Sequence, residues 1–111
     1  MSIPTTTTFG FEGYRIKEYK GVVRGIIVRS PTIAQGILGG LKNIIGGQIE
    51  AYTEMCEQAR GHAYELLIQH ARETGANAIV GLRYDASEVV AQHGATEVLC
   101  YGTAVVIEPI Q

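Results

Sequence analysis

Residues 48–74, QIEAYTEMCEQARGHAYELLIQHARET, are the one long periodic stretch of this chain. If Tyr52 is set at zero and each residue turns the chain by about 100°, a single apolar stripe falls within about 60° of it. The stripe consists of Ile49, Met55, Cys56, Ala59, Ala63, Leu66, Leu67 and His70, and the opposite side carries Glu50, Glu54, Glu65 and Arg72. A helix of this length measures about 39 Å, enough to cross a small sheet. We therefore predict a helix over 48–74, whose apolar stripe the rest of the chain covers.

Length and composition limit the class of protein. The chain has 111 residues, of which 46% are hydrophobic and 18% charged, and this predicts one globular domain over residues 1–111. The net charge of −2, with acids and bases interleaved, provides no basic stripe, so we expect no nucleic-acid partner. Two cysteines in apolar surroundings favour a reducing, cytoplasmic setting. We also expect neither an export signal nor a transmembrane segment, because no apolar run has the required length.

Extended segments flank the predicted helix. The sequence predicts strands over 14–29, over 78–86 with a continuation at 89–90, and over 97–107, with a brief edge strand over 5–8. Gly21 and Gly25 lie inside the first strand and indicate a bulge or a close approach by another backbone. Ser30-Pro31 predicts the start of a weak helix that Gly39-Gly40 interrupts, and His93-Gly94 predicts a hairpin turn.

This order of elements predicts a two-layer α+β fold, with one long helix packed on a small, mostly antiparallel sheet. The last strand alternates between two faces. One face bears Leu99, Tyr101, Thr103, Val105 and Ile107, and the other bears Val98, Cys100, Gly102, Ala104 and Val106. The second face is small, so we expect it to pack on Cys56, Ala59 and Ala63 of the helix. Both cysteines would then be reduced residues of the helix–sheet interface.

Four stretches in the same order carry a resemblance to a known family: EYKGVVRG (18–25), NIIGGQIEAY (43–52), ETGANAIVGLRYD (73–85) and GTAVVI (102–107). They closely resemble the YbjQ-like family of small bacterial proteins. The resemblance implies a β-α-β-β subunit similar to that of dodecin, assembly into a ring-shaped homopentamer, and binding of a heavy metal at ligands that it does not name. This chain departs from the family pattern at Ile37-Leu38-Gly39-Gly40, where members often carry aromatic and charged residues.

A soft metal ion needs thiolate or imidazole ligands that converge at about 2.0 to 2.3 Å. The candidates are Cys56, His62, His70, His93 and Cys100. His62 and His70 are eight residues apart, hence about 12 Å along a helix, and cannot share one ion. The metal hypothesis, for a heavy or transition metal ion, therefore rests on Cys56, His70 and Cys100. The alternative for His70, which lies in the apolar stripe, is a structural imidazole with a backbone carbonyl or a carboxylate as its partner.

Catalytic signals are weaker. Cys56 lacks a base three or four residues away, and Glu50 with Glu54 fits a solvated helix face. Arg83 and Asp85 share one side of a strand and could line a subunit cleft or form an interface ion pair. An enzyme with an active site at a subunit interface thus stays an alternative. A further alternative is a membrane-surface adaptor that uses the apolar segment 32–47.

The predicted outer face of the sheet requires a partner. One helix covers one face, and the other would expose Ile79, Leu99, Tyr101, Val105 and Ile107. A second apolar strip on the helix, Gly61, Tyr64 and Ile68, would also need cover. We therefore expect a homo-oligomer in which neighbouring copies bury both surfaces. The number five comes from the family resemblance alone.

Overall fold

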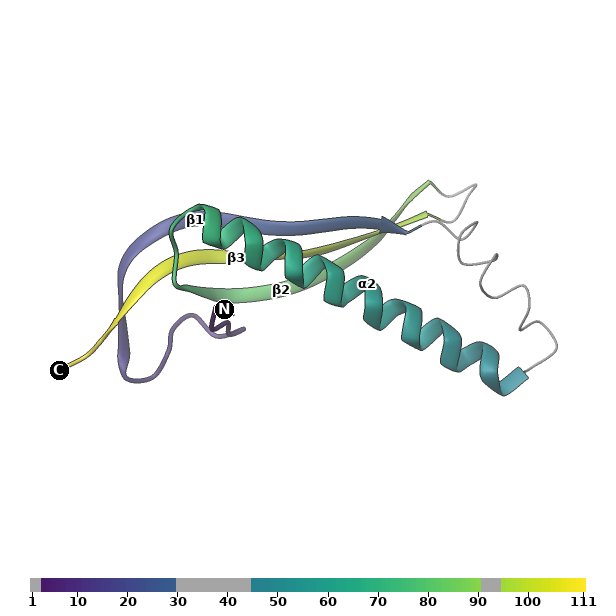
Figure 1. Cartoon of the computed structure of the whole chain (residues 1–111), viewed down its shortest axis with the longest axis horizontal. Helices are drawn as coiled ribbons and strands as arrows, with labels where there is room; N and C mark the ends of the chain where they lie inside the picture. The colour runs from purple at the N-terminus through teal and green to yellow at the C-terminus, as the bar shows by residue number, and fades with distance from the viewer. Residues whose placement is uncertain (1–2, 30–44, 91–94) are drawn as a thin grey trace.

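The computed structural model describes residues 3–29, 45–90 and 95–111 of the chain. Its elements are β1 (Tyr14–Arg29), α2 (Ile45–Glu73), β2 (Ala78–Val90) and β3 (Ala95–Pro109), arranged as a sheet with one helix against it (Figure 1). This confirms the predicted α+β fold, and each predicted boundary lies within four residues of the observed one. The weak helix predicted after Ser30-Pro31 and the turn at His93-Gly94 lie outside the described residues.

The described strands form one antiparallel sheet in the order β1-β3-β2. The pairing of β1 with β3 shifts between Tyr19 and Gly21, where Gly21 has a φ of 108°. The pairing of β2 with β3 shifts between Val80 and Arg83, around Gly81 with a φ of 65°. One class of β-bulge has a residue in such left-handed backbone, which glycine adopts without steric cost. The bulge predicted at Gly21 is therefore confirmed.

The N-terminal segment lies along the outer edge of β2. The Ile79 N–H donates to the Pro4 carbonyl at 3.1 Å, and the Thr6 N–H donates to the Ile79 carbonyl at 3.1 Å. The Gly81 N–H continues the pattern by donating to the Thr8 carbonyl at 2.8 Å. The edge strand predicted over 5–8 is reduced to one parallel bridge between Thr5 and Ile79. These bonds satisfy edge groups that would otherwise be open to another chain.

Helix α2 packs on the sheet through its C-terminal half. Ala59, Ala63, Leu67 and Ala71, which recur every four residues, are buried against β1 and β3. Contact is close because β1 has no side chain at Gly25, where a Cβ would overlap the carbonyl oxygen of Ala63. The N-terminal half of α2 extends past the end of the sheet and gives the molecule its elongated outline of 60 × 26 × 21 Å (Figure 1).

Two hydrophobic cores lie on the two faces of the sheet. The larger one lies under α2 and includes Val23, Ile79, Cys100 and Ala104. The smaller one is on the opposite face and consists of Ala78, Val80 and Val105, with Phe11, Ile16 and Ile107 against it.

These cores correct three details of the prediction. Ile79 pairs with Ala104 and lies on the helix side, not on the outer face. Val105 is fully buried and Ile107 is half-buried, because the turn containing Phe11 covers them within the same chain. The helix strip at Tyr64 and Ile68 is covered by the chain's own Ile3 and Thr5, so a neighbouring copy is not needed there.

Candidate functional site

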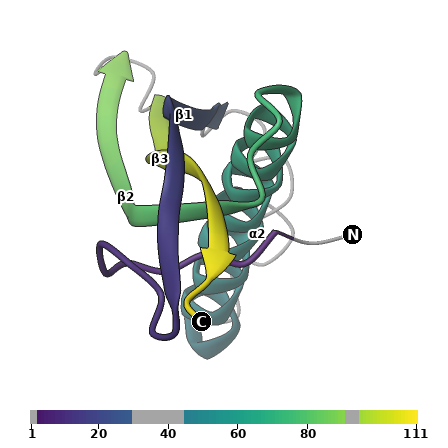
Figure 2. The ribbon, with the colours of Figure 1, turned by 90° about the vertical axis from the view of Figure 1, so that its left-hand side faces the viewer.

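One part of the outer sheet face has no cover from the described chain. We define the outer face as Val22, Arg24, Ile26 and Val28 of β1 with Leu99 and Tyr101 of β3. The register pairs Arg24 with Tyr101 and Ile26 with Leu99, while the intervening Val23 and Gly25 are buried under α2 on the other side. Val22 is 72% exposed, Val28 58% and Ile26 45%. Figure 2 shows α2 along the opposite side of the sheet. The outer face is thus an apolar surface with an arginine at its centre.

Charge is segregated between the two elements that lie side by side. Strand β1 carries Arg15, Lys17, Lys20, Arg24 and Arg29 against Glu18, whereas α2 carries Glu50, Glu54, Glu57, Glu65 and Glu73 against Arg60 and Arg72. Among the described residues the ion pairs are Arg15–Glu108 and Lys20–Glu18, so none joins α2 to β1. The first four of these glutamates are exposed and follow one side of the helix. Within the described residues, therefore, no ion pair neutralises the helix glutamates against β1.

Tyr84 and Cys100 form a polar contact between β2 and β3 beneath α2. Tyr84 and Cys100 are partners in the pairing of β2 with β3, and the phenol and the thiol influence each other's pKa. Burial raises the pKa of Tyr84 to about 12, and the Cys100 thiol adds to the rise. Burial also raises the pKa of the Cys100 thiol, and the neighbouring Tyr84 phenol partly offsets this rise. Arg60 of α2 lies 5.6 Å from the centre of the Tyr84 ring. Because only a thiolate is a strong nucleophile or metal ligand, Cys100 is kept in an inert form.

His70 links α2 to the edge of β1. Its Nδ1 accepts a hydrogen bond from the backbone N–H of Arg24 at 3.1 Å. The side chain is half-buried, so this bond satisfies a ring nitrogen that is partly removed from water. This backbone contact agrees with a structural role for His70, and its role as a metal ligand stays a prediction.

The proposed metal ligands do not fit one site within a single chain. Cys56 is exposed, and its predicted burial in the helix–sheet interface is wrong because this part of α2 extends past the sheet. Cys56 and His70 are fourteen residues apart on α2, hence about 21 Å. Cys100 is buried in the contact with Tyr84. Within the described ranges no three His, Cys, Asp or Glu side chains come together as a metal-binding group.

Arg83 and Asp85, which were expected to share one side of a strand, bind different groups. Nη1 of Arg83 donates to the carbonyls of Thr7 and Leu82, both at 2.8 Å, and Asp85 accepts from the Ala86 N–H at 2.9 Å. They form no ion pair with each other. Each side chain is thus committed to backbone groups.

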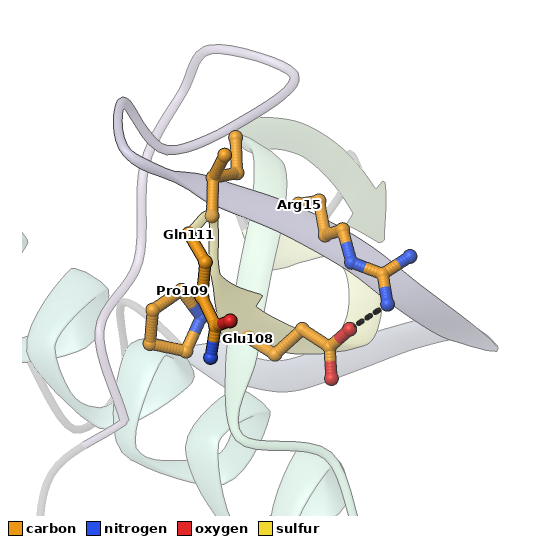
Figure 3. Close-up of a pocket in the computed structure, with 5 residues that line it drawn as sticks. Arg15, Glu108, Pro109 and Gln111 are labelled. Atoms are coloured by element: carbon orange, nitrogen blue, oxygen red, sulfur yellow. Dashed lines mark ion pairs between the residues drawn. The ribbon is translucent and has the colours of Figure 1, made fainter.

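A cavity of about 550 Å³ lies where β1 begins and β3 ends (Figure 3). It is lined by Arg15, Glu108, Pro109, Ile110 and Gln111, none of which the sequence analysis singled out. Arg15 and Glu108 form an ion pair across the two strands, so their charges neutralise each other. The sequence shows that Arg15 and Glu108 have opposite charges, but only the strand register shows that they face each other.

Comparisons with known proteins agree with this fold. A family model described as "Putative heavy-metal-binding" matches residues 3–108. A UPF0145 protein of Legionella pneumophila (strain Lens) is 59% identical over 107 residues, which make up 96% of this chain and 100% of the relative. A UPF0145 protein of Francisella tularensis subsp. tularensis is 57% identical over 107 residues, 96% of this chain and 99% of the relative.

A crystal structure agrees in fold. It is that of a protein with unknown function of the DUF74 family from Pediococcus pentosaceus, with a TM-score of 0.63 and 24% identity over 96% of this chain and 98% of that one. No helix within 3–29, 45–90 and 95–111 has the length and apolar character to cross a membrane. Matching nearly end to end, the chain belongs to the YbjQ family, the family of the UPF0145 proteins.

Proposed function

We propose that the protein is a homo-oligomeric scaffold or binding protein in which the outer face of each sheet is covered by α2 of a neighbouring copy. The observation that carries the proposal is the exposure of Val22, Ile26 and Val28 on one unbroken face. Burying a whole valine or isoleucine side chain stabilises by roughly 1.5 to 3 kcal/mol. Scaled by the exposed fractions of the three side chains, their burial would stabilise the assembly by about 3 to 5 kcal/mol per copy.

Charge and length support α2 as the covering element. Arg24 lies at the centre of the outer face, and the exposed side of α2 carries glutamates from Glu50 to Glu65. These glutamates span about 22 Å along the helix axis. Val22 to Val28 span about 20 Å along the strand. A helix of the neighbour can therefore lie along the whole outer face.

An interface that joins the helix of one copy to the sheet of the next is heterologous, and it forms a closed ring when the rotation between neighbours divides a full turn. A ring leaves no copy with an uncovered outer face. The family resemblance supports five copies, which gives about 60 kDa from a chain of 12.0 kDa.

Light scattering coupled to size exclusion at low micromolar concentration tests the assembly. We expect one species near five times the chain mass, and a stable folded species of 12.0 kDa would refute the proposal. Ile26→Asp places a charge on the outer face and should release single chains. Ile110→Asp is the matched control, because Ile110 is 61% exposed but lies outside the sheet, so it should leave the assembly intact.

The family description supports heavy-metal binding as a second candidate function. The exposed thiol of Cys56 is the accessible soft donor among the three candidate residues. A soft ion held by thiolates would then need Cys56 from more than one copy. Elemental analysis of the native protein should find metal that is lost in Cys56→Ser and kept in Cys100→Ser. Native protein without bound metal, or equal retention in both variants, would exclude this function.

A further inference from the structure

Gly61 lies in the interior of α2, where the described chain gives no reason for a glycine. After proline, glycine is the least favourable residue inside a helix. Gly61 is exposed, its φ is not positive, and among the described residues nothing lies within 4 Å of a Cβ built there. Gly25 differs, because a Cβ there would overlap α2. The missing side chain at Gly61 therefore serves no contact among the described residues.

Two glutamates flank this glycine on the exposed side of α2. Glu57 and Glu65 lie four residues before and after Gly61, and both are exposed. At about 100° per residue they stand about 40° to either side of it, each about 6 Å away along the helix axis. The helix surface thus has a shallow gap at Gly61 with a carboxylate on each flank. Such a gap fits a bulky side chain that has a cation on either side.

A row of that composition crosses the sheet on the side away from α2. The strand register pairs Tyr101 of β3 with Arg24 of β1 and with Arg83 of β2, and all three residues are exposed. Adjacent strands are about 4.8 Å apart, so about 10 Å separates the strands of the two arginines, close to the diameter of a helix. The Arg83 guanidinium lies 5.9 Å from the centre of the Phe9 ring, and its Nη1 binds two backbone carbonyls. A guanidinium has five N–H donors, so three others of Arg83 can bind a carboxylate.

We propose that Tyr101 of one copy packs on Gly61 of the neighbouring copy. Arg24 and Arg83 then lie on opposite flanks of the neighbour's helix. Each arginine pairs with one of the glutamates on those flanks, Glu57 or Glu65. This inference rests on the proposed function, in which α2 of a neighbour covers the outer face, and it names the point of contact. A side chain at position 61 would hold the helix away from the tyrosine ring, and this explains the glycine.

The contact joins two copies because Gly61 and Tyr101 face away from each other within one chain. Ala59 and Ala63 of α2 are buried against the sheet, and Gly61 stands about 160° round the helix from each of them. Tyr101 lies on the sheet face opposite α2 (Figure 2). The sheet itself separates the two residues of one chain, so the partner of Gly61 is a second copy.

Substitution of Gly61 gives opposite results with and without this contact. In a single chain alanine or leucine fits freely and favours the helix, so the folding equilibrium constant should rise about five-fold. In the assembly the added side chain pushes α2 off Tyr101. We expect the protein concentration at which the assembly half dissociates to rise about tenfold in Gly61→Ala. Gly61→Leu should give single chains of 12.0 kDa in light scattering coupled to size exclusion.

The matched control is His62→Ala. It changes an exposed residue next to Gly61 that points about 100° away, so it should leave the assembly intact. An assembly that survives Gly61→Leu but dissociates in Ile26→Asp would overturn this contact and leave the proposed function standing. Native protein of 12.0 kDa would overturn both. Lower stability of Gly61→Leu with unchanged mass would assign the contact to the same chain and overturn the inference.

Disulfide cross-linking identifies the partner residue directly. A disulfide needs Cα atoms about 4.4 to 6.8 Å apart, so Gly61→Cys combined with Tyr101→Cys should link neighbouring copies under mild oxidation. The variants carry Cys56→Ser, because the Cys56 thiol is exposed. We expect a ladder of linked chains on a non-reducing gel for the combined variant and single chains for either cysteine substitution alone. An assembled combined variant that forms no ladder would overturn the proposed pairing.

Discussion

Replacing Gly25 with alanine should weaken the docking of α2 on the sheet. The added Cβ would overlap the carbonyl oxygen of Ala63 and lie 2.5 Å from the nitrogen of Leu67 and 2.9 Å from Cβ of Leu66. Ordinary contacts begin at about 3.4 Å, so α2 must withdraw by more than about 1 Å, and overpacking of this kind costs about 1 to 3 kcal/mol. Two of the three atoms are helix backbone, which cannot rotate away, so the upper part of this range applies.

One effect opposes the loss. Alanine restricts the unfolded chain more than glycine and stabilises by roughly 0.5 to 1 kcal/mol where the backbone conformation allows it. Gly25 does not have a positive φ, so alanine is allowed there. The net expected decrease in the free energy of unfolding is therefore about 2 kcal/mol.

Urea unfolding followed by circular dichroism measures this change, at one fixed protein concentration because assembly contributes to stability. Gly10→Ala is the control, because nothing lies within 4 Å of a Cβ built there and its φ is not positive. The control should be neutral or slightly stabilised. A Gly25→Ala variant as stable as Gly10→Ala would refute the close backbone approach of α2 to β1.

Thiol labelling of the native protein should modify the exposed Cys56 rapidly and Cys100 only on unfolding, because Cys100 is buried and burial raises the pKa of its thiol. Rapid labelling of both cysteines would contradict this. The folded state holds the Tyr84 proton more tightly than the unfolded state, so stability should fall as pH rises from about 10 towards 12, and Tyr84→Phe should flatten that fall in urea titrations. Asn77→Ala should cost about 1 to 2 kcal/mol in urea unfolding, because the amide both donates to the Ile107 carbonyl and accepts from its N–H; a variant of native stability would show that water replaces both bonds.

Local patterns in the sequence determined the elements of this fold. The 3.6-residue periodicity of 48–74 predicts α2, and the two-residue alternation of 97–107 correctly places Cys100 and Ala104 on the helix side and Leu99 and Tyr101 on the outer face. A bulge or a close approach was expected at Gly21 and Gly25, and the structure has a bulge at the first and a close approach at the second. Such signals can be read from one segment because backbone geometry repeats over a few residues.

The tertiary structure decided which surfaces of those elements are covered. Cys56 belongs to the apolar stripe of α2, yet it is exposed, because the sequence pattern does not say which part of the helix contacts the sheet. Phe11 covers Val105, and Ile3 packs in the same core as Ile68; these are contacts between segments distant in sequence. The meeting of Tyr84 with Cys100 depends on a register shift between Val80 and Arg83. Register and docking position are settled by the packing of many distant residues at once, so no single segment of the sequence carries them.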